Sequence, residues 1–258
     1  MTAALRPPAV AGIFYPEKKE ALKDLIGRLA PALRGRRTGL AAIVPHGSLF
    51  SSGAVAAALY AELRPFDTAV ILGPNHSRLG ERLCLCADGE WSTPLGRVPV
   101  DRALARLLLK AVPELKKDAK AHQHEHAVEV QMPFLQQLWK IRGFVPVAVG
   151  GIDAEEARRL GRGLAQALRK SGREGLLIAT ANLTRYEPRE QAEQADRQRI
   201  ERITALDGEG LMRQVAESAG SMCGSPAVAA AISAAKELGG SRASLVKYEV
   251  GYGSFLIE

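Results

Sequence analysis

The stretch DTAVILGPNH at residues 67–76 decides the fold. Its apolar run is short and β-branched, which is typical of a strand buried on both faces of a sheet. A second such run, LAAIVPH at residues 40–46, also ends in a histidine. Ligands of open α/β sheets bind in the crevice at the carboxyl ends of the strands, so His46 and His76 are expected to share one site. The pair predicts a metal or acid–base centre, although a histidine beside a tight turn more often bonds a backbone carbonyl.

The rest of the chain alternates strand-length apolar runs with longer helical segments, and Pro133 predicts a kink or restart near residues 129–132. Strands are expected at 40–45, 67–73, 81–87, 144–150, 175–181 and 244–250, with 251–258 closing a hairpin about Gly251. Helices are expected at 17–32, 52–63, 101–111, 125–140, 153–171, 188–217 with a break near Gly208, and 225–238. The pattern predicts an α/β fold with a mostly parallel or mixed β-sheet and helices on both faces. No linker divides the chain, so residues 1–258 are expected to form one domain.

The composition, with 47% hydrophobic and 24% charged residues, is typical of a soluble globular protein. No apolar run approaches the roughly 20 residues of a membrane span, and the N-terminus lacks a signal pattern. A cytoplasmic location without a membrane partner is therefore expected. The net charge of +7 is spread along the chain and only 5% of residues are aromatic, which favours a solvated basic surface over a nucleic-acid groove. The three cysteines fit a reducing compartment, with Cys84 and Cys86 expected in the core.

The densest polar cluster is AHQHEHAVEVQMPFL at residues 121–135, where three of the five histidines fall within residues 122–126. An extended chain would point all three imidazoles to one side. On a helix, Glu125 and Glu129 would share one face. His126 and Glu125 are candidates for a general base and its orienting acid, or for groups that fix the tautomer of a metal ligand. The alternative is a polar helix entry whose histidines face water.

Two other segments offer chemistry. Asn182 and Arg185 follow the expected strand 175–181 and reach the same edge as the two histidines, where they are candidates to bind an anionic group. The alternative is a helix cap or turn beside a surface arginine. Cys223 and Ser225 precede the last expected helix, and a cysteine at a helix start can act as a nucleophile. Ser225 before Pro226 is also ordinary helix initiation.

Motifs along the whole chain carry a family resemblance. They are RPPAVAGIFYP, VPHGSLFSSG, ILGPNHS, WSTPLGRVPVD, EHAVEVQMPFLQ, CGSPAV and GYGSFLIE. In this order they resemble the Memo family, whose prokaryotic members include protein B of the AmmeMemoRadiSam system. That family is similar in fold to class III extradiol dioxygenases of the LigB type, in which two histidines and a carboxylate hold a non-haem iron.

The resemblance implies that His46 and His76 occupy the two histidine-ligand positions. It also implies that Glu125 and His126 lie beside the cleft. A radical-SAM protein of the same system is the partner that it suggests.

The chain departs from the family pattern at several places, two of which concern its candidate acid–base and ligand residues. The family often has D-x-x-H after the strand at 175–181, where this chain has Asn182 and Arg185, neither of which acts as an acid or base at neutral pH. Memo proteins can also supply a cysteine ligand near the C-terminus, and the dioxygenases a glutamate, from a loop that the spacing of this sequence predicts to be absent. Glu249 is the carboxylate nearest to that place. The third ligand is therefore predicted to be missing or misplaced.

These observations leave three hypotheses. The first is a Memo-family protein with a dioxygenase-like cleft whose degenerate metal site binds iron or copper weakly or not at all, and whose cleft receives a small anionic ligand, a peptide or a partner protein. The second is an iron- or copper-dependent oxidoreductase with His46 and His76 as ligands, His126 and Glu125 as acid–base groups and Arg185 as substrate anchor. The third is a cysteine hydrolase at Cys223.

Overall fold

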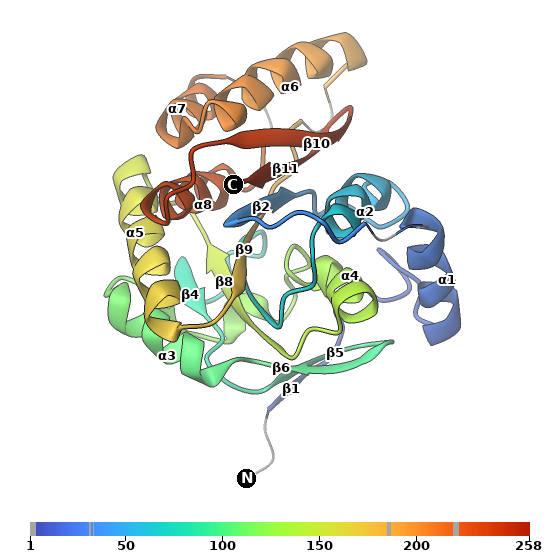
Figure 1. Ribbon diagram of the computed structural model, residues 1–258. Coiled ribbons are helices and arrows are strands. Elements are labelled where there is room, and N and C mark those ends of the chain that lie inside the picture. Colours follow the sequence, from blue (N-terminus) through green and yellow to red (C-terminus); the bar gives the residue numbers. More distant parts are fainter. Residues whose placement is uncertain (1–3, 31, 33, 185–186, 219–221) are drawn as a thin grey trace.

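The computed structural model describes residues 4–30, 32, 34–184, 187–218 and 222–258. Its larger sheet has eight strands in the order β10-β11-β2-β9-β3-β8-β4-β7 (Figure 1). The four inner strands pair in parallel and are almost entirely buried, as their continuous apolar runs predict. They are β2 (Ala41–Val44), β9 (Gly175–Thr180), β3 (Thr68–Pro74) and β8 (Gly143–Val149).

Antiparallel strands extend this sheet on both sides. On one side β4 (Leu83–Leu85) pairs antiparallel with β8, and β7 (Lys116–Lys117) pairs in parallel with β4. On the other side β10 (Ala243–Glu249) and β11 (Tyr252–Ile257) form the expected hairpin, and β11 pairs with β2. Gly251 allows the tight turn between them, since its φ of +84° is a conformation that other residues rarely adopt. The mixed sheet is therefore confirmed.

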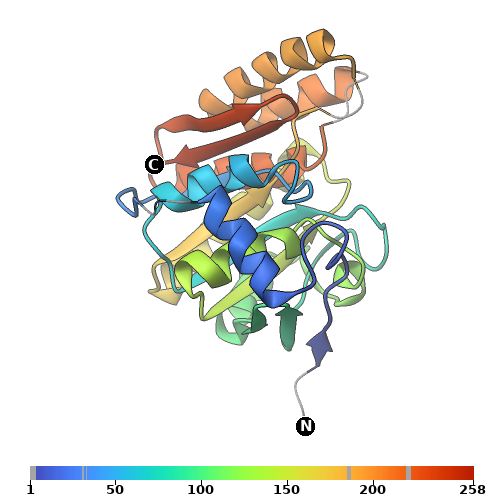
Figure 2. The ribbon, with the colours of Figure 1, turned by 90° about the vertical axis from the view of Figure 1, so that its right-hand side faces the viewer.

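A second, three-stranded sheet was not predicted from the sequence. It is built from β1 (Leu5–Arg6), β5 (Glu90–Thr93) and β6 (Gly96–Pro99), in the order β1-β5-β6. These strands are short, and β1 exists only because residues 5 and 6 pair with distant residues 90 and 91. The sheet places the N-terminal segment beside the body of the molecule (Figure 2).

Helices cover both faces of the larger sheet, and the side chains of β3 alternate between them. Val70 and Leu72 join one apolar cluster, whereas Ala69 and Ile71 join the other. The first face carries α3 (Arg102–Ala111), α5 (Ala154–Ser171) and α8 (Ser225–Glu237). The second carries α1 (Lys19–Leu29), α2 (Gly53–Glu62) and the turns at residues 129–139.

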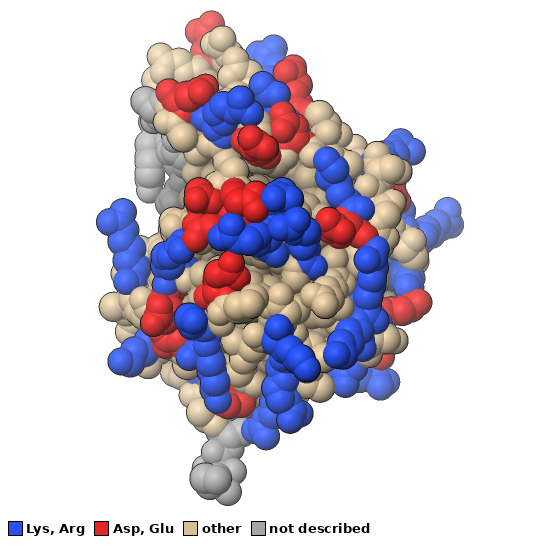
Figure 3. All heavy atoms as spheres, turned by 90° about the vertical axis from the view of Figure 1, so that its left-hand side faces the viewer, with Lys and Arg blue, Asp and Glu red and all other residues tan. Residues whose placement is uncertain are grey.

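The helix expected at 188–217 is broken as predicted, into α6 (Arg189–Thr204) and α7 (Gly208–Glu217). Asp207 caps α7 by accepting a hydrogen bond from the backbone N–H of Gly210. No helix in the described part of the chain is long and apolar enough to cross a membrane. Figure 3 shows Lys and Arg side chains interleaved with Asp and Glu on the face that carries α3 and α5.

The helix expected at 125–140 does not form as one unit. Residues 125–128 are turns and irregular chain, and the helical part is a 3-10 turn (Glu129–Gln131), a short α4 (Met132–Phe134) and a π-turn (Leu135–Trp139). The restart predicted near residues 129–132 is confirmed, since Pro133 lies in the first turn of α4. The expectation that Glu125 and Glu129 share one helix face is wrong, because Glu125 precedes the helical part.

Candidate metal centre

The carboxyl ends of β2 and β3 deliver two histidines to one place. Both strands pair in parallel with β9, which lies between them, so His46 and His76 emerge at the same edge of the sheet. Their ring centroids are 5.2 Å apart, with 73° between the ring planes. The two strand ends therefore bring the imidazoles together in the way that their position in the sequence suggests.

Cys223 completes this cluster from the segment that leads into α8. Its Sγ lies 3.0 Å from Nε2 of His46, and the ligand atoms of His46, His76 and Cys223 all lie within 4.8 Å of one another. Gly224 makes this approach possible, because a Cβ there would lie 2.3 Å from the carbonyl oxygen of Thr180. The sequence identified Cys223 as a candidate nucleophile at a helix start and did not place it beside the histidines.

Hydrogen bonds at Nδ1 fix the orientation of both histidine rings. Nδ1 of His46 lies 3.0 Å from Oγ1 of Thr180, and Nδ1 of His76 lies 2.9 Å from Oε1 of Glu125. The backbone N–H of His46 also donates to Oδ1 of Asn182 at 3.0 Å. Because Nδ1 of each ring is engaged, Nε2 is left for the shared centre.

Glu125 is a buried carboxylate whose acceptor capacity is used by nearby N–H groups. Besides Nδ1 of His76, it accepts from the backbone N–H groups of His76 at 2.7 Å and Ala127 at 2.9 Å. Burial raises the pKa of Glu125, but the hydrogen bond and positive charge of His76 outweigh it and lower the pKa to about 2. Glu125 is thus an ionised group that orients His76.

The electrostatics of the cluster favour a thiolate. Burial raises the pKa of Cys223, but hydrogen bonds with His46 and His76 dominate and lower it to about 5. Burial lowers the pKa of His76, whereas its hydrogen bonds with Cys223 and Glu125 raise it to about 9. These opposite shifts favour a Cys223 thiolate beside a charged His76 ring, and the thiolate is the form of cysteine that ligates metals.

His126 borders the same centre. Its ring stacks on that of His76 with centroids 4.7 Å apart and 8° between the planes, and Nδ1 lies 3.5 Å from Oε1 of Glu125. Phe14 also packs against the His126 ring, at a centroid distance of 4.8 Å. His76, Glu125 and His126 form a second group with metal-ligand spacing, but the oxygens of Glu125 are already engaged by N–H groups.

The other two histidines of the 122–126 cluster lie elsewhere, so the three imidazoles do not face one side. His122 is 1% exposed and packs edge-on against Trp91. Burial, with a smaller effect of Arg6, lowers the pKa of His122 to about 4. His124 is exposed to solvent.

The remaining predicted site residues are not ligands in either metal-spaced group of the described residues. Asn182 is buried and supports the backbone of His46, as described above. Arg185 lies outside the described residues. Glu249 is exposed on β10 and forms an ion pair with Lys247 at 3.2 Å, so it joins neither metal-spaced group of the described chain. Cys84 and Cys86 are buried in the core, as expected.

Comparisons with known proteins agree with the motif pattern. The model of the Memo-like protein family matches residues 6–254. The chain belongs to the Memo family. The MEMO1 family protein MK0963 of Methanopyrus kandleri is 40% identical, over 94% of this chain and 91% of that protein. A MEMO1 family protein of Methanosarcina mazei is 37% identical, over 98% of this chain and 99% of that protein.

Among solved structures, this Memo-family chain is similar to the uncharacterized protein JW3007 from Escherichia coli K12. The TM-score is 0.62 at 16% sequence identity, and the match covers 86% of this chain and all 100% of that one. This likeness concerns the fold.

Proposed function

We propose that this Memo-family protein binds one transition-metal ion between His46, His76 and Cys223 and that the ion serves oxidoreductase chemistry. The observation that carries the proposal is the convergence of three ligand atoms within 4.8 Å of one another. Two imidazoles and a thiolate form a donor set that suits copper, iron and zinc rather than magnesium or calcium. A bound copper or iron ion would supply one-electron redox chemistry.

The surrounding residues fit such a site. Thr180 and Glu125 engage Nδ1 of the two histidines, which is the outer-shell arrangement that orients imidazole ligands. His126 stacks on His76, where it is a candidate to hold or move a proton of a substrate. We favour this metal-dependent hypothesis over a degenerate site. Cys223 offers a third ligand, which the sequence alone had not identified.

The first hypothesis from the sequence, a cleft that receives a small anion, a peptide or a radical-SAM partner protein, remains a proposal beside this one. Metal binding and partner binding are compatible, since the metal would use only the side chains of His46, His76 and Cys223. A cytoplasmic location likewise remains a prediction.

The hydrolase alternative rests on one specific observation. The 3.0 Å contact between Cys223 Sγ and His46 Nε2, with Thr180 behind the imidazole, resembles the nucleophile, base and orienting group of a cysteine enzyme. A hydrolase requires one imidazole beside the thiol. The second imidazole, His76, is better explained by ligation of a metal.

Metal reconstitution tests the proposal. The purified, metal-stripped protein is loaded anaerobically with Fe(II) or Cu(I), and bound metal is measured per chain. Wild type is expected to bind one equivalent, and His46→Ala and Cys223→Ala are expected to lose it. His124→Ala is the matched control, because His124 is exposed and outside the cluster. Equal, near-zero binding in wild type and His46→Ala would contradict the proposal.

Thiol labelling separates the two candidates. A bound metal is expected to protect Cys223 from a thiol-directed alkylating probe, because the sulfur would be ligated. If labelling of Cys223 is fast and unchanged after incubation with metal, the hydrolase alternative is favoured. The buried Cys84 and Cys86 provide the background, since burial raises the pKa of each thiol.

A further inference from the structure

Helix α6 is predominantly polar, yet the face that it buries carries two charged side chains. The buried residues of the helix are spaced as one stripe and are Ala192, Asp196, Arg199 and Ile203. Asp196 is 0% exposed and Arg199 is 1% exposed. Charged residues are almost never buried so completely unless they are paired, so these two require an explanation.

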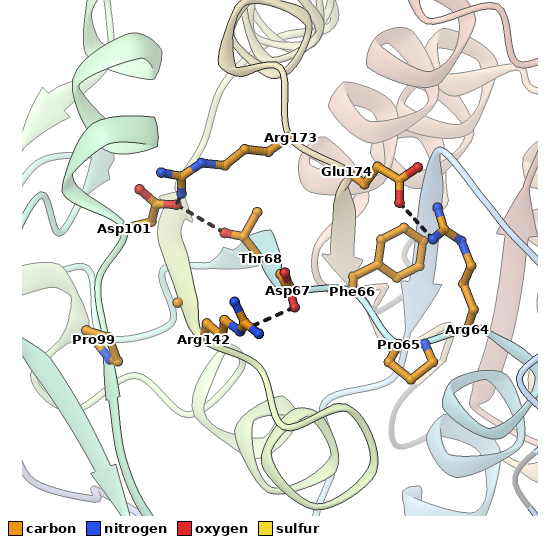
Figure 4. Close-up of a pocket in the computed structure, with 11 residues that line it drawn as sticks. Arg64, Pro65, Phe66, Asp67, Thr68, Pro99, Asp101, Arg142, Arg173 and Glu174 are labelled. Carbon is orange, nitrogen blue, oxygen red and sulfur yellow. Dashed lines mark hydrogen bonds and ion pairs between the residues drawn. The ribbon is translucent and has the colours of Figure 1, made fainter.

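The cavity where β3, β8 and β9 begin shows the usual arrangement of charges (Figure 4). There Arg173 pairs with Asp101 and Arg64 pairs with Glu174, so a carboxylate directly matches each of these guanidinium groups. The two charges of α6 differ from this pattern, because both bond to the backbone of other segments.

Arg199 and Asp196 each engage one backbone group. Arg199 donates through Nη1 to the carbonyl oxygen of Leu183, which lies three residues beyond the end of β9. Asp196 accepts through Oδ2 from the backbone N–H of Gly251 at 2.7 Å and from the hydroxyl of Tyr248 at 3.0 Å. The helix therefore contacts both the exit of β9 and the turn between β10 and β11.

Leu183 and Gly251 close these contacts into a ring of hydrogen bonds. The backbone N–H of Leu183 donates to the carbonyl oxygen of Gly251 at 2.8 Å. Arg199 takes the carbonyl group of Leu183 and Asp196 takes the N–H of Gly251, so all four backbone polar groups of these two residues are used. Leu183 is thus fixed relative to α6 through both of its backbone groups.

Stability alone does not explain the two charges. Nη2 of Arg199 and Oδ1 of Asp196 are buried and have no hydrogen-bond partner among the described residues. Such atoms cost free energy, and apolar residues of similar volume in place of buried charges are often neutral or stabilising. What the two side chains add is direction, because each holds one backbone group in one place.

The ring adjoins the segment that supports the candidate metal ligands. Asn182 immediately precedes Leu183, and its Oδ1 accepts the backbone N–H of His46 at 3.0 Å. The backbone of Asn182 also forms an antiparallel bridge with Cys223. Thr180, at the end of β9, lies 3.0 Å from Nδ1 of His46. A shift of Leu183 would therefore displace the support of two of the three ligands.

We propose that Arg199 and Asp196 are positioning residues that hold Leu183 and thereby set the placement of His46 and Cys223. Their contacts reach the two ligand residues through Asn182. The consequence for metal affinity rests on the proposed function. The placement of His46 and Cys223 does not, because it is a property of the metal-free protein.

Amide hydrogen exchange in the metal-free protein, followed residue by residue by NMR, tests the positioning directly. In Arg199→Gln the backbone N–H groups of Leu183 and His46 are expected to exchange about tenfold faster, since local opening no longer breaks the bond from Arg199. The N–H groups of β8 are expected to keep their wild-type rates. Arg199→Lys is expected to restore protection, because it keeps a cationic donor. Arg197→Gln is the matched control, since Arg197 is exposed on the same helix.

The metal-loaded protein gives a second, spectroscopic readout. Co(II) is expected to bind Arg199→Gln about tenfold more weakly than wild type, with a shifted thiolate-to-cobalt band, because the supports of His46 and Cys223 have moved. Arg197→Gln is expected to match wild type in both respects. If the wild-type protein binds no metal, the proposed function fails, and the exchange experiment still decides the positioning role.

Two results would overturn the inference. One is wild-type exchange at Leu183 and His46 in folded Arg199→Gln. The other is equal acceleration in β8, which would show that Arg199 stabilises the whole fold rather than this segment. If Arg199→Gln does not fold, Tyr248→Phe decides, because it removes only a hydroxyl donor to Asp196. Tyr248→Phe is expected to speed exchange at Leu183 and His46, and unchanged rates would overturn the inference.

Discussion

Glu125 and Glu129 are buried carboxylates four residues apart, and they face different regions of the molecule. Glu125 faces the histidine cluster and accepts N–H groups of His76 and Ala127. Glu129 faces the N-terminal segment, where it accepts from the hydroxyl of Tyr15 at 2.6 Å and from backbone N–H groups at Ala9 and Val10. The first carboxylate thus orients a candidate metal ligand, and the second fastens a distant segment of chain.

Arg6 connects these two regions. It forms an ion pair with Glu129, donates to the carbonyl oxygens of His122 at 2.8 Å and Glu125 at 2.7 Å, and lies over the ring of Trp91 at 4.1 Å. The N-terminal segment held in this way places Phe14 against His126. Two glutamates of one short motif therefore have different roles. Glu125 orients a candidate metal ligand, whereas Glu129 holds the N-terminal segment in place.

Glu129→Gln is expected to give the largest loss of stability. Replacing one partner of a buried, hydrogen-bonded ion pair leaves Arg6 without its counter-charge, which costs about 3–5 kcal/mol. Chemical denaturation measures this difference. Glu155→Gln on α5 is the control, since its carboxylate pairs with arginines at the surface. A loss below about 1 kcal/mol for Glu129→Gln would contradict the anchoring role.

The buried position of His122 predicts that the free energy of unfolding depends on pH. In the folded protein burial holds the pKa of His122 at about 4, whereas in the unfolded chain it is near 6.5. The unfolded state therefore binds more protons between these values, so the stability contribution is complete above pH 6.5 and falls by about 3 kcal/mol as the pH approaches 4.

His122→Leu is expected to remove that part of the pH profile. It also removes two ring nitrogens that have no hydrogen-bond partner among the described residues, so its cost near neutral pH should be small. Denaturation midpoints measured from pH 4 to pH 7 for both proteins provide the test. Parallel profiles for wild type and His122→Leu would contradict the assignment.

Glu125→Gln is expected to act on metal binding. Loss of the charge behind His76 should weaken affinity about 10–100-fold, because outer-shell partners set the orientation and basicity of an imidazole ligand. Metal titration with a competing chelator measures the change. Glu114→Gln is a suitable control, since Glu114 is an exposed residue that pairs with Arg159 and belongs to neither metal-spaced group. An unchanged affinity in Glu125→Gln would show that His76 does not depend on Glu125.

Much of the fold follows from the sequence because the inner strands are continuous apolar runs. In β3, Ala69 and Ile71 enter one apolar cluster and Val70 and Leu72 the other, so the run itself indicates burial on both faces. The three-stranded sheet was not predictable in this way. Its first strand has two residues, and their conformation depends on pairing with residues 90 and 91.

The histidine part of the site was predictable for a physical reason, and the cysteine part was not. His46 and His76 follow parallel strands, whose carboxyl ends meet at one edge of the sheet. Cys223 is 177 residues from His46 and reaches it through a backbone bridge to Asn182, just past β9. Its position depends on the close passage of Gly224 past Thr180, which is a tertiary contact. The CGSPAV motif, with its glycine directly after Cys223, was the local signal that could have suggested it.

The visible and near-ultraviolet spectrum of the Co(II)-loaded protein tests the central claim most directly. Ligation by Cys223 predicts an intense thiolate-to-cobalt charge-transfer band in wild type and in the control Cys86→Ala, and its loss in Cys223→Ser. Cys86 is buried in the core and belongs to neither metal-spaced group. A wild-type protein that binds Co(II) at one equivalent without this band, or a band that survives in Cys223→Ser, would contradict a centre built from His46, His76 and Cys223.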